Sequence, residues 1–290
     1  MNGPVIPTTI AAALRYMRDR FAGSEIETPG LDARLLLEWV MGADRLSVLS
    51  NPQRVLNADE LSRLSDALAR RIYHEPVHRI IGNRDFYGLK FELSTETLEP
   101  RSDTECLVDL VLEHLVTRQN QPLHILDLGT GTGIIAISLL SQLSSASAVA
   151  VDISADALAT TLKNGTINDV ASRLTCLESN WFEAVRGRFD LIVSNPPYIA
   201  STDISGLSKE VRNHDPRVAL DGGEDGLSAY RVLAKKAVGY LNAKGLVAVE
   251  IGFDQIDRVA ELFAANGFVL IKAAKDLAGR DRAMIFSRRE

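Results

Sequence analysis

The sequence lacks the features that mark secreted or membrane proteins. Only two cysteines, Cys106 and Cys176, occur in 290 residues. Two are too few for a disulfide framework, and their apolar surroundings indicate small buried side chains. No apolar stretch approaches the length of a membrane span, and the first nine residues show no signal-peptide pattern. We therefore expect a cytoplasmic protein with no membrane partner.

An excess of basic residues is also missing, as are several catalytic motifs. The net charge of -6 argues against broad nucleic-acid binding, although it leaves room for a local basic face. His74 and His78 have helical spacing, but Pro76 separates them and no third ligand is evident, so we expect no metal site. There is no G-x-S-x-G elbow and no P-loop lysine. The chain is long enough for one large domain and a smaller one.

Four consecutive residues, Asn195-Pro196-Pro197-Tyr198, follow an apolar run at 189–194 that predicts a buried strand. Two prolines cannot continue a strand ladder, so the strand must end there in a stiff loop. Ligands bind at the carboxyl ends of strands in open parallel sheets. The loop would hold a side-chain amide, carbonyl groups and an aromatic face at an active site. The alternative is a proline-rich surface turn.

A second motif joins the apolar run 124–128 to Gly129-Thr130-Gly131-Thr132-Gly133 and an apolar helix. Strand, glycine turn and helix form the first unit of a nucleotide-type α/β fold. A dinucleotide fingerprint would need a third glycine at position 134, which is Ile134. The G-x-G-x-G spacing instead resembles the loop of class I S-adenosylmethionine-dependent methyltransferases, and we assign these five residues to cofactor binding.

Later residues also fit an adenosine ligand. The apolar run 148–152 ends in Asp152, about 20 residues after the glycine loop, where a carboxylate accepts both ribose hydroxyls. The alternative role for Asp152 is as a cap of the next helix. Asn180 or Trp181, which follow another strand-like run, would meet the edge and face of the adenine. An aromatic side chain at that position could equally belong to the core.

The N-terminal third has the apolar periodicity of helices. Two stripes carry it, with members Ile10, Ala13, Leu14, Met17 and Phe21 in one and Leu61, Leu64, Leu68 and Ile72 in the other. Asn57 and Glu60 predict a capping box for the second helix. Pro29 and Gly42 bracket a further helix. These stripes fit a core better than a binding surface.

Residues 79–93 alternate around Gly88 and predict a β-hairpin. Ser102 and Glu105 predict a capping box that opens a helix through Val116. We therefore divide the chain into a helical domain at 1–75, a hairpin linker at 76–100 and an S-adenosylmethionine-dependent methyltransferase domain at 101–290. Because a helical domain attached to a methyltransferase needs a role, our hypothesis is that it serves in substrate recognition and grips a protein substrate.

Further segments extend the similarity to known enzymes. Together with the loop at 195–198, residues 100–105 (Pro-Arg-Ser-Asp-Thr-Glu), 220–231 and 249–255 resemble the HemK/PrmC family, the protein-(glutamine-N5) methyltransferases of peptide chain release factors. Ser102 stands where that family usually has a second proline, and serine there also occurs in sister enzymes that methylate a ribosomal protein. His214-Asp215-Pro216 keeps the acid of an aromatic-Glu-Pro pattern but loses the ring.

The resemblance implies an α/β class I methyltransferase (Rossmann-like) fold with a mostly parallel sheet and S-adenosyl-L-methionine as cofactor. The substrate would be the glutamine of the Gly-Gly-Gln loop in class I release factors, bound by a monomer with no stable nucleic-acid partner. Asn195 and Pro196 could accept the two N–H groups of that glutamine amide, while Pro197 holds the loop and Tyr198 offers a stacking face. The residues alone indicate only methylation of a planar amide or amino nitrogen. Adenine N6-methylation, ribosomal-protein glutamine methylation and a non-catalytic S-adenosylmethionine-binding module therefore stay open.

Overall fold

A computed structural model describes residues 6–289 of the chain. Residues 1–5, which begin the segment expected to lack a signal peptide, and residue 290 lie outside the described part. The chain forms two compact units, one of Met1–Gly82 with Lys209–His214 and one of Asn83–Ser208 with Asp215–Glu290. Within the described residues, no helix has the length and apolar character needed to cross a lipid bilayer.

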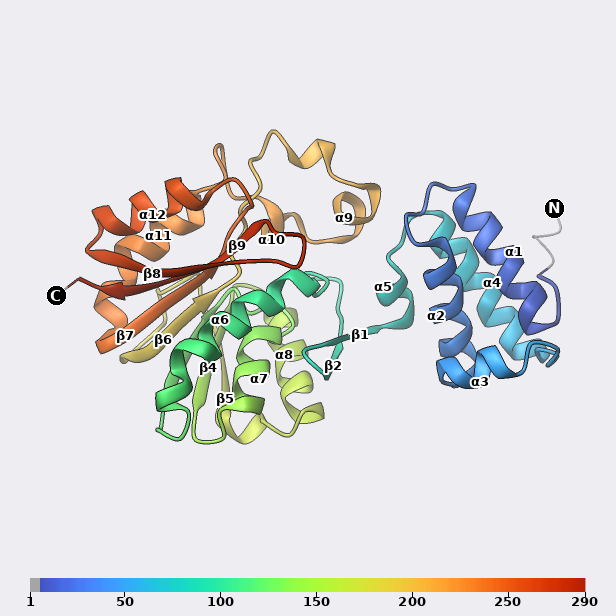
Figure 1. The fold of residues 1–290 in the computed structure, drawn as a ribbon, viewed down its shortest axis with the longest axis horizontal. Coiled ribbons are helices and arrows are strands. Elements are labelled where there is room, and N and C mark those ends of the chain that lie inside the picture. Colours follow the sequence, from blue (N-terminus) through green and yellow to red (C-terminus); the bar gives the residue numbers. More distant parts are fainter. Residues whose placement is uncertain (1–5, 290) are drawn as a thin grey trace. The chain divides into compact units, whose positions relative to one another are not determined.

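The first unit is a bundle of helices around an apolar core of its own (Figure 1). Its helices are α1 (Ile10–Ala22), α2 (Pro29–Met41), α3 (Arg45–Ser50), α4 (Ala58–Ile72), α5 (Val77–Ile81) and α9 (Lys209–His214). The predicted stripe on α1 is confirmed, because these members are fully buried: Ile10, Ala13, Met17 and Phe21. Asn57 and Glu60 form the predicted capping box, with a bond of 2.9 Å in each direction. Helix α2 begins and ends as Pro29 and Gly42 predict.

A buried arginine joins three segments of this unit. Arg71 in α4 is 2% exposed, and its guanidinium donates to Asp32 of α2 at 2.7 Å and to Glu210 of α9 at 2.5 Å. A third bond reaches the Glu75 carbonyl oxygen at 3.1 Å. A buried charge is stable only while it is paired. Arg71 therefore fixes α9 to helices that lie far earlier in the sequence.

A β-hairpin opens the second unit. Strands β1 (Asn83–Phe86) and β2 (Leu89–Glu92) pair antiparallel across a two-residue turn. Both turn residues, Tyr87 and Gly88, have positive φ angles, as a tight hairpin turn requires. The expected hairpin is thus present, but the prediction that it begins near residue 79 is wrong. Residues 79–81 belong to α5, which the left-handed Gly82 ends.

A seven-stranded sheet forms the centre of the second unit, in the order β5-β4-β3-β6-β7-β9-β8 (Figure 1). Its strands are β3 (His124–Leu128), β4 (Ser147–Asp152), β5 (Leu174–Glu178), β6 (Phe189–Ser194), β7 (Leu241–Glu250), β8 (Phe268–Lys275) and β9 (Asp281–Arg288). Strand β9 is antiparallel to both neighbours, and the other pairs are parallel. The predicted α/β fold with a mostly parallel sheet is confirmed.

Helices cover both faces of this sheet (Figure 1). On one face lie α6 (Glu105–Leu115), α7 (Ile134–Gln142) and α8 (Ala155–Ile167); on the other lie α11 (Ser228–Ala237) and α12 (Ile256–Ala265). Successive β3 side chains point to opposite faces. Ile125 therefore joins one apolar core, whereas Leu126 and Leu128 join the other. Short helical segments complete the unit: α10 (Arg217–Leu220) and 3-10 turns at Ser102–Thr104, Val116–Arg118, Ala171–Arg173, Ile204–Gly206 and Val238–Tyr240.

The predicted capping box at Ser102 and Glu105 is wrong. Ser102 lies in a 3-10 turn, and Thr104 occupies the N-cap position of α6 without a side-chain capping bond. The Glu105 carboxylate instead accepts the N–H of Tyr87 at 2.9 Å. The Glu105 carboxylate, which would have accepted the Ser102 N–H in a capping box, thus binds the N–H of the hairpin turn instead.

Loss of the Arg71 side chain should loosen the helical unit more than loss of an exposed arginine. We expect Arg71→Ala to lower the free energy of opening of α2 and α4 by about 3–5 kcal/mol, because Asp32 stays buried without its partner. The control Arg18→Ala removes an exposed pair with Asp19 and should cost no more than about 0.5 kcal/mol. Hydrogen–deuterium exchange of the full chain measures both. Equal protection in the two variants would contradict the role given to Arg71.

Candidate active site

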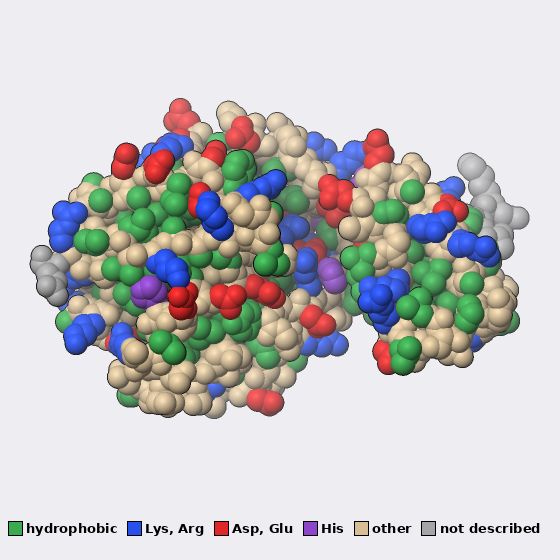
Figure 2. Space-filling model, in the orientation of Figure 1, with side chains coloured by type: hydrophobic (Ala, Val, Ile, Leu, Met, Phe, Trp, Pro, Cys, Tyr) green, Lys and Arg blue, Asp and Glu red, His purple; other side chains and the backbone are tan. Residues whose placement is uncertain are grey.

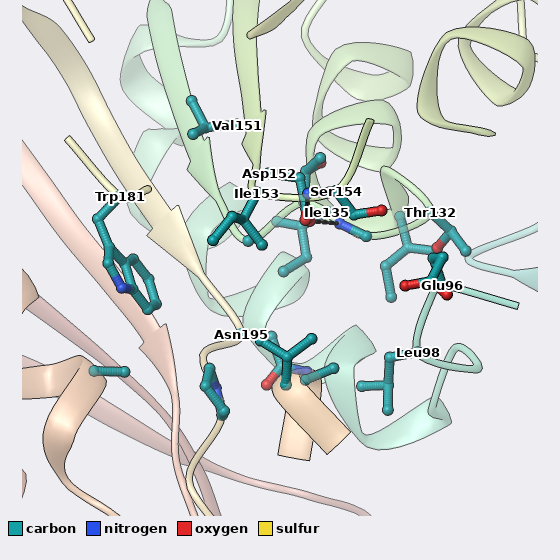
Figure 3. Close-up of a pocket in the computed structure, with 18 of the residues that line it drawn as sticks. Glu96, Leu98, Thr132, Ile135, Val151, Asp152, Ile153, Ser154, Trp181 and Asn195 are labelled. Atoms are coloured by element: carbon teal, nitrogen blue, oxygen red, sulfur yellow. Dashed lines mark hydrogen bonds between the residues drawn. The ribbon is translucent and has the colours of Figure 1, made fainter. Parts of the chain in front are cut away.

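A cavity of about 350 Å³ opens at the carboxyl ends of β3 and β6 (Figure 3). These two strands are neighbours at the point where the strand order reverses, which is where ligands bind in open α/β sheets. The Ser194 hydroxyl donates to the Leu128 carbonyl at 2.6 Å and ties the two strand ends together. The loops that follow these two strands therefore face one space.

Most of the residues predicted for the site line this cavity. They are Gly129, Thr130, Gly131, Thr132, Asp152, Asn180, Trp181, Asn195 and Pro197. Three other predicted residues, Gly133, Pro196 and Tyr198, lie outside its lining within the described part of the chain. The structure therefore brings the two sequence motifs together, although they are more than 60 residues apart.

The glycine loop has a backbone that other residues rarely adopt. Gly129, Gly131 and Gly133 have φ angles of 72°, 57° and 84°. A Cβ on either of the first two would meet nothing within 4 Å, so open space lies beside this backbone. A Cβ on Gly133 would lie 2.8 Å from Ile137 Cδ1. The first two glycines thus leave room for a ligand, and the third leaves room for the side chains of Ile137 in α7 and Thr161 in α8.

Asp152 holds the glycine loop and still has acceptor capacity. Its Oδ2 accepts the Gly131 N–H at 2.9 Å, and its Oδ1 accepts the Ser154 N–H at 3.0 Å. Ser154, not Asp152, is the N-cap of α8, since its side chain accepts the N–H of Ala157. Each Asp152 oxygen keeps a further lone pair at the edge of the cavity, where two hydroxyl groups could donate to it.

Trp181 combines the two roles that the sequence left open. Its half-buried ring packs against the apolar core on the α11 side and also lines the cavity (Figure 3). Its φ of 52° is left-handed, a strained backbone for a bulky residue that is most common at functional sites. Asn180 beside it is exposed, and its amide donates to Glu183 at 3.1 Å.

The loop after β6 presents Asn195 to the cavity (Figure 3). The Asn195 amide nitrogen donates to the Thr104 hydroxyl at 3.2 Å. Pro196 is buried, and Tyr198 packs its ring against the core on the α11 side. The Tyr198 hydroxyl donates to Glu250 at 3.4 Å. The stacking role predicted for Tyr198 therefore stays a prediction.

Residues 220–231 and 249–255, which the sequence singled out without a role, close around this loop. Gln255 donates to the Tyr198 carbonyl at 2.9 Å. A Cβ on Gly222 would lie 2.9 Å from the Pro197 oxygen, and one on Gly226 would lie 2.5 Å from the Tyr198 oxygen. Only glycine permits this approach. The Gln255 bond thus holds the Tyr198 carbonyl, and the two glycines let their segment lie against the carbonyl groups of Pro197 and Tyr198.

Two buried carboxylates near the site were not predicted from the sequence. Asp127 and Glu250 stand at or next to the last position of strands β3 and β7, and burial raises the pKa of each to about 7. Asp127 accepts the Thr130 hydroxyl at 2.7 Å and the Ala136 N–H at 3.3 Å through one oxygen. Its other oxygen has no hydrogen-bond partner among the described residues. An acidic residue at the end of an apolar strand is the sequence signal that could have identified Asp127 and Glu250 as residues near the site.

Asp215 gives the loop at 214–216 a structural role at the cavity. Arg101 lines the cavity, and its guanidinium pairs with Asp215 at 2.6 Å. Asp215 is buried and also accepts the Glu99 N–H at 3.3 Å. The acid that the sequence keeps at this position therefore holds one wall of the cavity in place.

Two protein-family models match the chain. The PrmC N-terminal domain matches residues 12–82, inside the helical unit, and the methyltransferase small domain matches residues 105–245. The second match contains the glycine loop, Asp152 and the loop at 195–198, so both motifs fall in one recognised domain.

Curated relatives match nearly the whole chain. The release factor glutamine methyltransferase of Agrobacterium fabrum is 48% identical over 283 residues, which cover 97% of this chain and 98% of that protein. Its counterpart from Caulobacter vibrioides is 39% identical over 278 residues, 96% of each chain. A solved ribosomal protein L11 methylase from Lactobacillus delbrueckii subsp. bulgaricus has a TM-score of 0.51 at 22% identity. It covers 70% of this chain and 94% of its own, which supports the fold alone.

The buried Asp127 should make stability depend on pH. Its pKa is about 7 in the folded chain against an ordinary 3.8, so the folded state binds the proton more tightly and loses stability as pH rises between these values. Asp127→Asn keeps an oxygen for both hydrogen bonds and cannot ionise. We expect it to exceed the wild type in free energy of unfolding by about 2–4 kcal/mol at pH 8, and by less at pH 5.

Urea denaturation at the two pH values measures this difference, with the exposed Asp156→Asn as control. An advantage of Asp127→Asn that is equal or larger at pH 5 would contradict the burial argument.

Proposed function

This chain belongs to the family of release factor glutamine methyltransferases, and we propose that it methylates the side-chain amide nitrogen (N5) of the glutamine in the Gly-Gly-Gln loop of class I peptide chain release factors. The observation that carries the proposal is the similarity over both units, which includes the helical one as well as the catalytic one. It favours a release factor over the ribosomal-protein and adenine substrates that the motif alone leaves open. Basic and acidic side chains are intermixed on the face of the α/β unit that Figure 2 shows, so this face has no basic patch of the kind that binds nucleic acid.

The cavity fits S-adenosyl-L-methionine. Asp152 has free lone pairs for the two ribose hydroxyls, and Trp181 offers an aromatic face for the adenine beside Asn180. Gly129 and Gly131 leave open space beside the backbone of their loop, which a Cβ would narrow. The bound cofactor supplies a methyl carbon attached to a positively charged sulfur, an electrophile that needs no further activation.

The task of the protein is to orient a weak nucleophile. The lone pair of an amide nitrogen is delocalised into its carbonyl, so it must be held in line with the methyl group. The Asn195 Oδ1 and the Pro196 carbonyl accept the two N–H groups of the glutamine and favour the positive charge that develops on nitrogen. Pro197 keeps the loop rigid and Tyr198 supports it. No strong base is required, because the methylated nitrogen becomes acidic and then loses its proton.

The remaining parts serve the protein substrate. The helical unit grips the release factor outside its glutamine loop, while that loop enters the cavity of the catalytic unit. The enzyme works as a monomer in the cytoplasm, where translation terminates, and holds no nucleic acid stably.

Removal of the Asp152 carboxylate should weaken cofactor binding. We expect Asp152→Ala to raise the Kd for S-adenosylmethionine by roughly 10²-fold, through the loss of two hydrogen bonds to a charged acceptor. Asp156→Ala, which removes an exposed acid from the first turn of α8, should change it less than about 2-fold. Isothermal titration calorimetry measures both, and equal affinities in the two variants would refute the assignment of Asp152.

Mass spectrometry tests the reaction itself. An unmodified class I release factor incubated with the enzyme and S-adenosylmethionine should gain about 14 Da on the Gly-Gly-Gln glutamine. Asn195→Ala should lower the rate by roughly 10²–10³, as expected for the loss of one oriented polar contact. No gain from the wild type, despite cofactor binding, would overturn the substrate. Near-normal turnover by Asn195→Ala would overturn the mechanism.

A further inference from the structure

We propose that Glu250 is a positioning residue for the catalytic loop, residues 195–198. Through Thr104 it sets whether Oδ1 or Nδ2 of the Asn195 amide faces the substrate. This inference rests on the proposed function, since it concerns how the glutamine amide is received. Neither Glu250 nor Thr104 has to touch the substrate for it to hold.

Three elements meet at Glu250. It ends β7, which pairs with β6 directly before the catalytic loop, with Ser194 opposite Val249. Thr104, at the start of α6, is fully buried, and its hydroxyl is an electrostatic neighbour of the Glu250 carboxylate. Tyr198, at the other end of the loop, donates to Glu250 Oε1 at 3.4 Å. The other oxygen, Oε2, has no hydrogen-bond partner among the described residues. The Glu250 carboxylate thus contacts one end of residues 195–198 through Tyr198 and lies beside Thr104, which contacts the other end.

The Thr104 hydroxyl has a single proton, which decides the orientation of Asn195. While Thr104 donates that proton to Glu250, it offers Asn195 only lone pairs. The amide must therefore face Thr104 with Nδ2, as the 3.2 Å bond shows, and Oδ1 is left for the cavity. Without an acceptor at position 250, Thr104 would be free to donate to Oδ1. The amide would then turn its N–H groups toward the N–H groups of the glutamine, and donor would meet donor.

Glu250 is a buried acid, and the nearby cation Arg282 does not fully account for its presence there. Arg282 is the cation that attracts it, but Arg282 also pairs with Asp276 at 3.0 Å and with Asp103 at 3.3 Å. Its charge is shared among several acids, and the pKa of Glu250 stays raised to about 7. A buried acid with an unpaired oxygen lowers stability and is uncommon in native proteins. Its work as an acceptor for Thr104 and Tyr198 supplies a local reason for its burial.

Two pairs of variants of the full chain test this proposal. Glu250→Met removes the acceptor at similar shape, and Glu250→Gln keeps an acceptor oxygen. Thr104→Val removes the relay hydroxyl, and Thr104→Ser keeps it. We expect the Met and Val variants to lower kcat for release-factor methylation by about 10–100-fold, as displaced reacting groups do. The Gln and Ser variants should stay within about 5-fold of the wild type, and the Kd for S-adenosylmethionine should change less than about 2-fold throughout.

The double variant Thr104→Val with Glu250→Met should be no slower than the slower single variant, because both remove the same relay. A wild-type kcat in Glu250→Met, or an equal loss in all four single variants, would overturn the inference. The exposed Glu178→Gln, at the end of β5, serves as the control for removal of a carboxylate. If the wild type leaves the release factor unmodified, the proposed function fails. If the wild type is active and only the expected differences are missing, the inference alone fails.

Discussion

Strands β3 and β6 lie side by side, and the bond from the Ser194 hydroxyl to the Leu128 carbonyl holds their ends at one level. The next helix after β3 is α7 on one face of the sheet, while the chain after β6 leads to α11 on the opposite face. A space must therefore open between the two loops. The glycine loop and the loop of Asn195 both line it, so cofactor and amide can meet without any movement of the sheet.

The site is built at a cost in stability. Asp127 and Glu250 are fully buried acids, and each has one oxygen without a partner among the described residues. Trp181 holds a left-handed backbone, and Gly222 and Gly226 allow a contact that no other residue would permit. These departures from ordinary folding rules gather around one cavity, as expected where function competes with stability.

Local patterns made much of this fold predictable from the sequence. The bounds of β3 and β6, the glycine turn and the position of Asp152 depend on neighbours within a few residues. The errors concern distant partners. Glu105 lost its capping box to a donor from the hairpin, and residues 79–81 joined a helix that Gly82 ends. Thr104 and Glu250 could not be predicted to meet, since their contact requires the order of the strands. The capture of Glu210 by Arg71 likewise has no local signal.

The most direct measurement is a crystal structure of the full chain with S-adenosylhomocysteine and a peptide that contains Gly-Gly-Gln. We expect the ribose hydroxyls on Asp152, and the glutamine nitrogen within about 2.7–3.2 Å of both Asn195 Oδ1 and the Pro196 carbonyl oxygen. A cofactor outside this cavity, or a glutamine amide that faces Asn195 Nδ2, would contradict the arrangement described above.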